Sequence, residues 1–238
     1  MSATRLLARI AATAASTGVM LAAQASDFES AAKGASEQIK AYDSSVTNVS
    51  TIIGEGAGVK TNCGVTKNEP FEAFYCGTGG SVIVFSKAAL ENIGRAKGKT
   101  AVMAVVAHEF GHARQHMVSG FTSNTIWTAS VDELQADCIA GVYMRNIKSL
   151  ELTEEELDSV SDFMKDIGSY VFTERDWHGS PEMRSASFRY GYRSGDMNRC
   201  LATKENNWGK AVESLDNEIK RVPARIDSLL KWGSDILK

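Results

Sequence analysis

Three of the four histidines in the chain fall within nine consecutive residues, 108–116. His108 and His112 are four residues apart, so on a helix their side chains lie one above the other on the same face. Two imidazoles in that arrangement can bind one zinc ion, and Glu109 lies close enough to take a proton from the water that zinc activates. The spacing predicts a zinc-dependent hydrolase that cleaves peptide bonds, with Glu109 as the general base.

The segment around these residues has the character of a helix. Residues 101–118 are largely apolar, and Thr100 is suited to cap their first turn. Gly111 stands beside a ligand position, where a missing side chain lets another backbone approach closely. His116 lies about 12 Å along the axis from His108, too far to share one metal, and we expect it to be a polar residue at the helix end that favours the dipole.

A catalytic zinc site normally has three protein ligands, so a further ligand must come from elsewhere. Glu133 and Asp137 are four residues apart in a segment, 131–148, that we expect to be a helix capped by Ser130. One carboxylate can bind zinc while the other accepts the remaining N–H of a zinc-bound histidine. Glu133 also fits a capping box with Ser130, in which it would only bond back to the helix start. Spacing leaves both interpretations open, and does not say which carboxylate is the ligand.

The rest of the chain predicts a mainly helical α+β fold with a small sheet. The segments 71–75 and 81–85 have strand character around a glycine turn, and the second is a continuous apolar run typical of a buried strand. We also expect 81–86 to be the edge strand along which a peptide substrate lies. Further helices are expected over 26–50, from Thr153, from Pro181 to Tyr192 and over 207–236.

The N-terminus has the pattern of an export signal. Arg5 and Arg9 precede a small, apolar run that ends in the small-x-small sequence Ala23-Gln24-Ala25. We expect 1–25 to be a signal peptide and 26–238 to be a single domain, located in the periplasm or outside the cell. The alternative is a frayed helix on a cytosolic protein. No other segment approaches the roughly 20 apolar residues that span a bilayer, which predicts no stable membrane insertion.

The four cysteines are Cys63, Cys76, Cys138 and Cys200. An even number in an exported protein predicts two disulfides, and spacing alone cannot choose among the three pairings. Because Cys63 and Cys76 are near neighbours around a turn-rich stretch, they form the natural local pair, which leaves Cys138 with Cys200. Free buried thiols are the alternative if the protein is not exported.

The overall composition is that of an ordinary globular protein. Hydrophobic residues make up 43% of the chain, charged residues 23%, and the formal net charge is -3. No stripe of lysine and arginine is present, which argues against nucleic acid as a partner. We therefore expect a peptide or protein substrate; the sequence does not indicate an oligomeric state.

Taken in order, these motifs resemble the bacterial putative neutral zinc metallopeptidase family. The resemblance covers roughly residues 60–203 and differs around 118–130, which is short, and in the final helix. It is carried by HEFGH, by Glu133-Leu134-Gln135-Ala136-Asp137-Cys138-Ile139-Ala140-Gly141, by His178-Gly179 with Arg184 downstream, and by Asn62-Cys63-Gly64, Phe74-Tyr75-Cys76 and Tyr192-Arg193-Ser194-Gly195-Asp196. The family is similar in turn to gluzincins of the HtpX and prenyl-protein protease type.

The resemblance implies a zincin-like fold of the minimal gluzincin kind, with one zinc ion per chain. Glu133 then becomes the third ligand and Asp137 the carboxylate that orients a ligand. Arg184 is expected to pair with Asp137 or another carboxylate of the site, or to serve at the surface. A Cys138–Cys200 bridge would then tie the helix of Glu133 to the segment after Arg184 and hold the loop of His178 near the metal.

The same resemblance places His178 over the metal, with Gly179 where the relatives have proline. His178 can donate a hydrogen bond to the oxyanion of the reaction, or occupy the fourth zinc position in a latent enzyme. The alternative without a functional role is a loop histidine packed beside Trp177. A rival function is a zinc-bound scaffold or chaperone-like module, although a purely structural site would not need the base Glu109.

Overall fold

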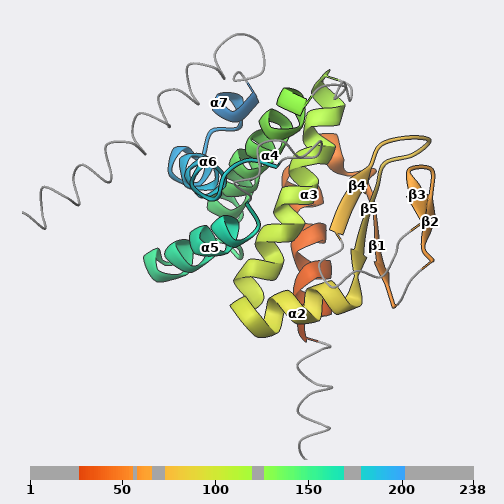
Figure 1. Cartoon of the computed structure of the whole chain (residues 1–238), viewed down its shortest axis with the longest axis horizontal. Coiled ribbons are helices and arrows are strands. Elements are labelled where there is room, and N and C mark those ends of the chain that lie inside the picture. The colour runs from red at the N-terminus through yellow and green to blue at the C-terminus, as the bar shows by residue number, and fades with distance from the viewer. Residues whose placement is uncertain (1–26, 56–57, 66–72, 120–125, 169–177, 202–238) are drawn as a thin grey trace, which may run out of the picture.

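The computed structural model describes residues 27–55, 58–65, 73–119, 126–168 and 178–201, excepting the side chains of 119 and 126–130. The predicted signal peptide and the predicted helix over 207–236 lie outside these residues. In chain order the elements are a helix over 27–42, the 3₁₀ helix η1 (Ser44–Val46), β1 (Ser50–Gly54), β2 (Lys60–Thr61), β3 (Gly64–Val65), β4 (Ala73–Cys76), β5 (Val82–Ser86), α2 (Lys87–Lys97), α3 (Lys99–Ser119), α4 (Ile126–Asn146), α5 (Glu154–Asp166), α6 (Pro181–Ser194) and α7 (Met197–Leu201) (Figure 1). The fold is mainly helical with a small sheet, which confirms the predicted α+β class.

The main sheet has the order β1-β5-β4. β1 pairs in parallel with β5, and β4 pairs antiparallel on its other side. The expectation that 81–86 is an edge strand is therefore wrong, because a strand paired on both sides has no free backbone edge to offer a peptide. Among the described strands, β1 and β4 each pair with β5 alone, so both are edge strands of this sheet.

Helix α3 lies in the middle of the molecule, with the sheet on one side and α4 and α6 on the other (Figure 1). It begins at Lys99, so Thr100 belongs to its first turn and is not its cap. Met117 and Val118 near its end are exposed, but its other apolar residues are buried or partly buried, as expected for a central helix. The buried ones are Ala101, Val102, Ala104, Val105, Val106, Ala107, Phe110 and Ala113.

Glycines let α4 pack closely against both of its neighbours. A β-carbon at Gly111 would lie 2.7 Å from the carbonyl oxygen of Ala136, inside the closest approach that real side chains make. On the opposite face of α4, a β-carbon at Gly141 would meet the backbone of Phe188, and one at Gly191 would meet that of Cys138. Because Gly111 brings α4 against α3, it also sets the distance between the residues that these two helices carry.

The capping predictions had mixed outcomes. Thr153 caps α5 in a capping box with Glu156, and Pro181 opens α6, as the sequence indicates. Helix α4, however, begins at Ile126, so Ser130 lies inside the helix and not at its start. The capping-box interpretation of Glu133 is therefore wrong, because Ser130 occupies no N-cap position.

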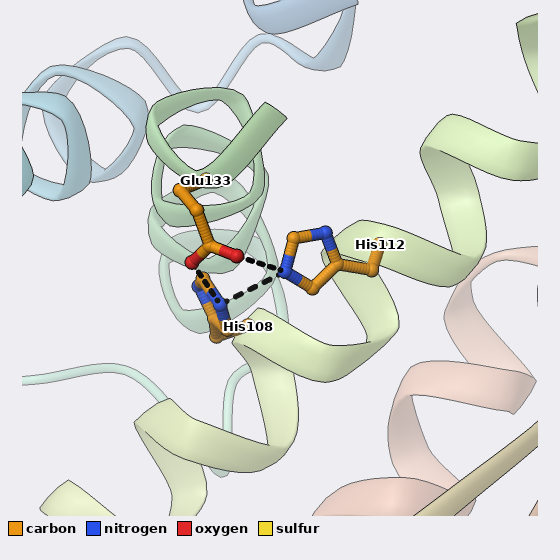
Figure 2. Close-up of side chains that lie close together, drawn as sticks. All are labelled: His108, His112 and Glu133. Carbon is orange, nitrogen blue, oxygen red and sulfur yellow. Dashed lines mark hydrogen bonds and ion pairs between the residues drawn. The ribbon is translucent and has the colours of Figure 1, made fainter. Parts of the chain in front are cut away.

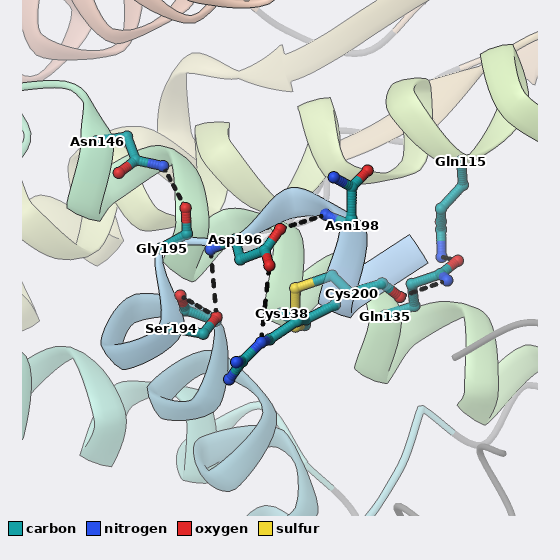
Figure 3. Close-up of a disulfide and its surroundings, with 11 residues drawn as sticks. Gln115, Gln135, Cys138, Asn146, Ser194, Gly195, Asp196, Asn198 and Cys200 are labelled. Carbon is teal, nitrogen blue, oxygen red and sulfur yellow. Dashed lines mark hydrogen bonds and ion pairs between the residues drawn. A yellow bond between two sulfur atoms is a disulfide. The ribbon is translucent and has the colours of Figure 1, made fainter. Parts of the chain in front are cut away.

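Both predicted disulfides are present, Cys63–Cys76 and Cys138–Cys200. The second joins α4 to α7, a helix of only five residues, across a sequence separation of 62 (Figure 3). Of the described helices, none has the length and hydropathy required to cross a bilayer.

Candidate metal centre

His108 and His112 of α3 and Glu133 of α4 point their donor atoms at one another (Figure 2). The Nε2 atoms of the two histidines are 3.1 Å apart. Glu133 places one carboxylate oxygen 3.2 Å from Nε2 of His108 and the other 3.3 Å from Nε2 of His112. Three donors from two helices thus converge on one point.

The separations between these donor atoms suit a tetrahedral zinc ion, with each histidine facing a different oxygen of Glu133. With each ligand about 2.1 Å from the ion, tetrahedral geometry separates ligand atoms by about 3.4 Å. The observed separations of 3.1, 3.2 and 3.3 Å lie close to that value. Two imidazole nitrogens and one carboxylate are also a donor set found in catalytic zinc sites. The residues present therefore fit a zinc ion.

Behind His108 lies a buried ion pair. Nδ1 of His108 is 2.8 Å from Oδ1 of Asp137, a carboxylate with no exposed surface. Arg184 donates to both oxygens of that carboxylate, from Nε at 2.8 Å and from Nη2 at 2.9 Å, and it also lies 3.4 Å from Glu133. Asp137 thus accepts from the side of His108 that points away from Glu133, and the single positive charge of Arg184 offsets part of the charge of the two carboxylates.

These charges make the centre attractive to a cation. Burial alone would lower the pKa of His108, but Asp137 and Glu133 outweigh it and raise that pKa to about 10. Burial is likewise outweighed at His112, whose pKa is raised chiefly by Glu133. Burial alone would raise the pKa of Glu133, yet His112 and His108 hold that pKa well below its usual value. The two imidazoles are therefore surrounded by negative potential, which favours a proton or a metal cation between them.

Behind His112 the chemistry is different. Nδ1 of His112 is 2.9 Å from Oε1 of Gln115, and the amide nitrogen of Gln115 is 2.9 Å from Oε1 of Gln135. Gln135 in turn donates to the carbonyl oxygen of Cys200 at 2.8 Å (Figure 3). Neither glutamine was predicted from the sequence to support the metal centre. The available signal was that Gln115 follows His112 by three residues, and so shares its helix face.

Glu109 lines the same cavity as the three donors and is buried, with 6% of its surface exposed. Burial raises the pKa of its carboxyl group, and the neighbouring His108 and His112 offset this only in part. Within the described part of the chain, Glu109 forms no ion pair. Its carboxylate is therefore placed to exchange a proton with a molecule inside the cavity.

The cavity has a volume of about 560 Å³ and two kinds of wall. One wall carries the polar residues of α3, α4 and α6, and the other is formed mostly by apolar side chains of β4, α2, α3 and α5. The apolar side chains are Ala73, Phe74, Ile93, Val105, Phe163, Met164 and Ile167. The predicted site residues thus border a space large enough for part of a peptide.

His178 stands at the rim of this cavity. Its Nε2 is 3.7 Å from Oε1 of Glu133, and 52% of the side chain is exposed. The following Gly179 has φ of 103°, a backbone conformation that favours glycine. His178 is thus near the three donors but, unlike His108 and His112, is open to solvent.

His116 has a contact that the sequence did not indicate. It lies in the last turn of α3, as expected, but its Nδ1 is hydrogen-bonded to the hydroxyl group of Tyr75 at 2.6 Å. A β-carbon at Gly77 would lie only 2.5 Å from the same ring. His116 therefore links the end of α3 to the edge strand β4.

Curated relatives of the chain are themselves uncharacterized. The protein YpfJ of Escherichia coli K12 is 28% identical over 177 residues, with 64% of this chain and 59% of YpfJ covered. The protein Rv2575 of Mycobacterium tuberculosis H37Rv is 30% identical over 177 residues, with 60% of this chain and 58% of Rv2575 covered. The chain thus spans less than two thirds of the length of these relatives.

No solved structure matches the chain, so its likeness to gluzincins of the HtpX type stays a prediction. The family described as "Putative neutral zinc metallopeptidase" matches residues 36–203, well over half of the chain. That match includes both helices of the metal centre, the segment with His178 and Arg184, and all four cysteines. The chain therefore belongs to the putative neutral zinc metallopeptidase family.

Proposed function

We propose that the protein is an exported zinc-dependent endopeptidase. The observation that carries this proposal is the position of Glu109, which lines one cavity together with His108, His112 and Glu133. A site built only to hold a structural metal needs no carboxylate beside the ligands and usually closes the fourth position with a protein donor. Here a buried base and an accessible cavity adjoin the donors, as hydrolysis requires.

Glu109 would serve as the general base and then as the general acid. The chemistry that zinc supplies at such a site is a lowered pKa of water and a polarised substrate carbonyl. Glu109 accepts the proton of the water and hands it to the nitrogen of the leaving amine. Its raised pKa suits both roles, because a catalytic acid-base group works best with a pKa near the working pH.

The walls of the cavity suggest how a peptide lies. The edge strand β4 contributes Ala73, Phe74 and Tyr75 to the lining, and its outer backbone can pair with an extended substrate. Phe163 and Met164 of α5 contribute apolar side chains to the same lining. We infer that the substrate is an extended peptide segment with a bulky apolar side chain next to the bond that is cleaved.

His178 is proposed to act on the substrate directly. At the cavity rim its ring can donate a hydrogen bond to the carbonyl oxygen as negative charge develops there. The second possibility, a latent enzyme in which His178 occupies the fourth metal position, draws on its distance of 3.7 Å from Glu133. The exposed ring favours the first role, since an inhibitory ligand would be held by buried partners.

The two disulfides support the proposal that the protein is exported. Two bridges within one chain are typical of oxidising compartments, which here means the periplasm or the exterior of the cell.

The proposed function is tested by the variant Glu109→Gln in the purified, zinc-loaded protein. Turnover of casein or of a peptide library should fall by about a thousandfold or more, since both proton transfers lose their carrier, while bound zinc stays at one ion per chain. The matched control is Glu37→Gln, an exposed residue on the helix over 27–42, which should behave as wild type. Unchanged cleavage by Glu109→Gln would overturn the mechanism; a wild-type protein that binds zinc yet cleaves nothing would favour the scaffold function.

A further inference from the structure

Two buried glutamines form a neutral hydrogen-bonded chain behind His112. Gln115 and Gln135 have only 3% and 1% of their surfaces exposed. The amide nitrogen of Gln115 donates to two acceptors, the carbonyl oxygen of Asp132 at 2.7 Å and Oε1 of Gln135 at 2.9 Å. Burying two amides is unfavourable unless their hydrogen bonds are made, so an arrangement this complete calls for an explanation.

Two backbone carbonyl groups fix which way both amides face. A carbonyl oxygen can only accept, so the side of Gln115 that contacts Asp132 must be its nitrogen. The same reasoning applies to Gln135, whose nitrogen must face the carbonyl oxygen of Cys200. Each glutamine then has its oxygen on the opposite side, which directs Oε1 of Gln115 to His112.

The consequence reaches the metal centre. Because Oε1 of Gln115 can only accept, Nδ1 of His112 must carry the proton. In a neutral imidazole the lone pair then lies on Nε2, which is the atom that faces His108 and Glu133. We propose that Gln115 is a positioning residue for the metal, which holds His112 in the ligating tautomer and fixes the direction of its ring.

The chain of hydrogen bonds ends at a disulfide. Cys200, whose carbonyl oxygen accepts from Gln135, is bonded to Cys138, which lies three residues after Gln135 on α4 (Figure 3). Helix α7 is short, and this bridge ties it covalently to α4. The Cys138–Cys200 disulfide thereby keeps the last acceptor in place, and links the oxidation state of the protein to the metal centre.

The inference rests on the proposed function only in requiring that a zinc ion binds at His108, His112 and Glu133. The test is the zinc dissociation constant of the full chain, measured by competition with a chromophoric chelator. Gln115→Met should weaken zinc binding by about tenfold to a hundredfold, the usual effect of removing a partner of a ligating histidine. Gln135→Met and Cys138→Ser/Cys200→Ser should weaken it by less, since they act through Gln115.

The matched control is Cys63→Ser/Cys76→Ser, which removes the other disulfide. That bridge joins the turn between β2 and β3 to the end of β4 and takes no part in the chain of hydrogen bonds, so zinc affinity should equal that of wild type. Wild-type affinity in Gln115→Met, with its circular dichroism spectrum retained, would overturn the proposal. Equal losses in both disulfide variants would also overturn the special role of Cys138–Cys200. If wild type itself binds no zinc, the proposed function fails and not merely the positioning role.

A second measurement needs no variant. Long-range ¹H–¹⁵N spectra of the zinc-loaded wild-type protein report which nitrogen of each of its histidines carries a proton, and only four histidines need to be assigned. The proposal expects His112 to be protonated at Nδ1. A signal from His112 with the proton on Nε2, or with metal at Nδ1, would contradict it even if every glutamine variant failed to fold.

Discussion

The two histidines of the metal centre are one helical turn apart, yet they are held by opposite kinds of chemistry. On one side, His108 meets the carboxylate of Asp137, which is itself paired with Arg184 inside the protein. On the other side, His112 meets the neutral amide of Gln115, which continues to Gln135. Both partners accept from Nδ1 and leave Nε2 facing the metal position, so they agree in geometry and differ in charge.

The difference indicates that the two partners affect their histidines in different ways. A carboxylate behind a ligand makes the imidazole more basic and adds negative charge near the cation. A neutral amide fixes the tautomer without adding charge. A second carboxylate in place of Gln115 would increase the net negative charge of a buried site that already contains Glu109, Glu133 and Asp137. Among the described residues, Arg184 is the basic side chain that pairs with these carboxylates. One charged and one neutral partner orient both ligands and limit this repulsion.

The largest effect should come from breaking the charged side. Asp137→Asn leaves the guanidinium of Arg184 buried beside an amide, and breaking such a pair costs about 3–5 kcal/mol of the free energy of unfolding. Zinc affinity should fall as well, by about tenfold to a hundredfold, which denaturation and chelator competition would measure.

Its control is Asp158→Asn, where an exposed carboxylate pairs with Arg189 at the surface. That change should alter the free energy of unfolding by less than about 1 kcal/mol and leave zinc binding unaltered. Similar small effects in both variants would show that Asp137 is not the dominant support of His108.

Changes of pH should have a smaller and gradual effect on zinc affinity and on stability. Zinc must displace protons from His108 and His112 when it binds. The affinity of the protein for zinc should therefore increase as pH rises towards about 10, by up to about tenfold per pH unit for each proton released. The stability of the metal-free protein should change in the opposite direction. Because folding raises the pKa of His108 from 6.5 to about 10, the contribution of His108 to stability is complete below pH 6.5 and is lost as pH rises through about 10.

Chelator competition and thermal unfolding across this range would measure both trends. In Asp137→Asn the pH dependence should weaken, since the carboxylate that does most to raise the pKa of His108 is gone. A zinc affinity that is flat with pH in the wild-type protein would contradict the assigned ligands.

The smallest effect on zinc binding should come from His178, the half-exposed histidine of the rim. His178→Ala is expected to leave zinc affinity and stability near wild type, within about 0.5 kcal/mol, because no buried ligand depends on it. Turnover should nevertheless fall by about a hundredfold or more if the ring stabilises the oxyanion. A rise in turnover, together with weaker zinc binding, would instead identify the latent form.

The residues that the structure brings together are largely those whose spacing can be read along one helix. His108 and His112, and likewise Glu133 and Asp137, are pairs four residues apart, and this regularity survives any uncertainty about helix ends. The disulfide pairing also followed from the sequence, since the nearness of Cys63 to Cys76 determines the other pair.

What could not be predicted depends on contacts between distant segments. The residues of β1 show no distinct strand pattern after the preceding helix. They form a strand because they pair with β5, about thirty residues later. That pairing also makes β5 the central strand and leaves β1 and β4 as the edges of the sheet. Gln115 matches no motif, and Gln135 lies within the Glu133–Gly141 motif without a role that the motif indicates, because a neutral amide acquires its role only when α3 and α4 are packed together.

Anomalous X-ray diffraction from crystals of the zinc-loaded protein would show whether one zinc ion lies between α3 and α4. We expect a single strong zinc peak in contact with Nε2 of His108, Nε2 of His112 and a carboxylate oxygen of Glu133. A peak elsewhere, or no zinc at this position in protein saturated with the metal, would contradict it.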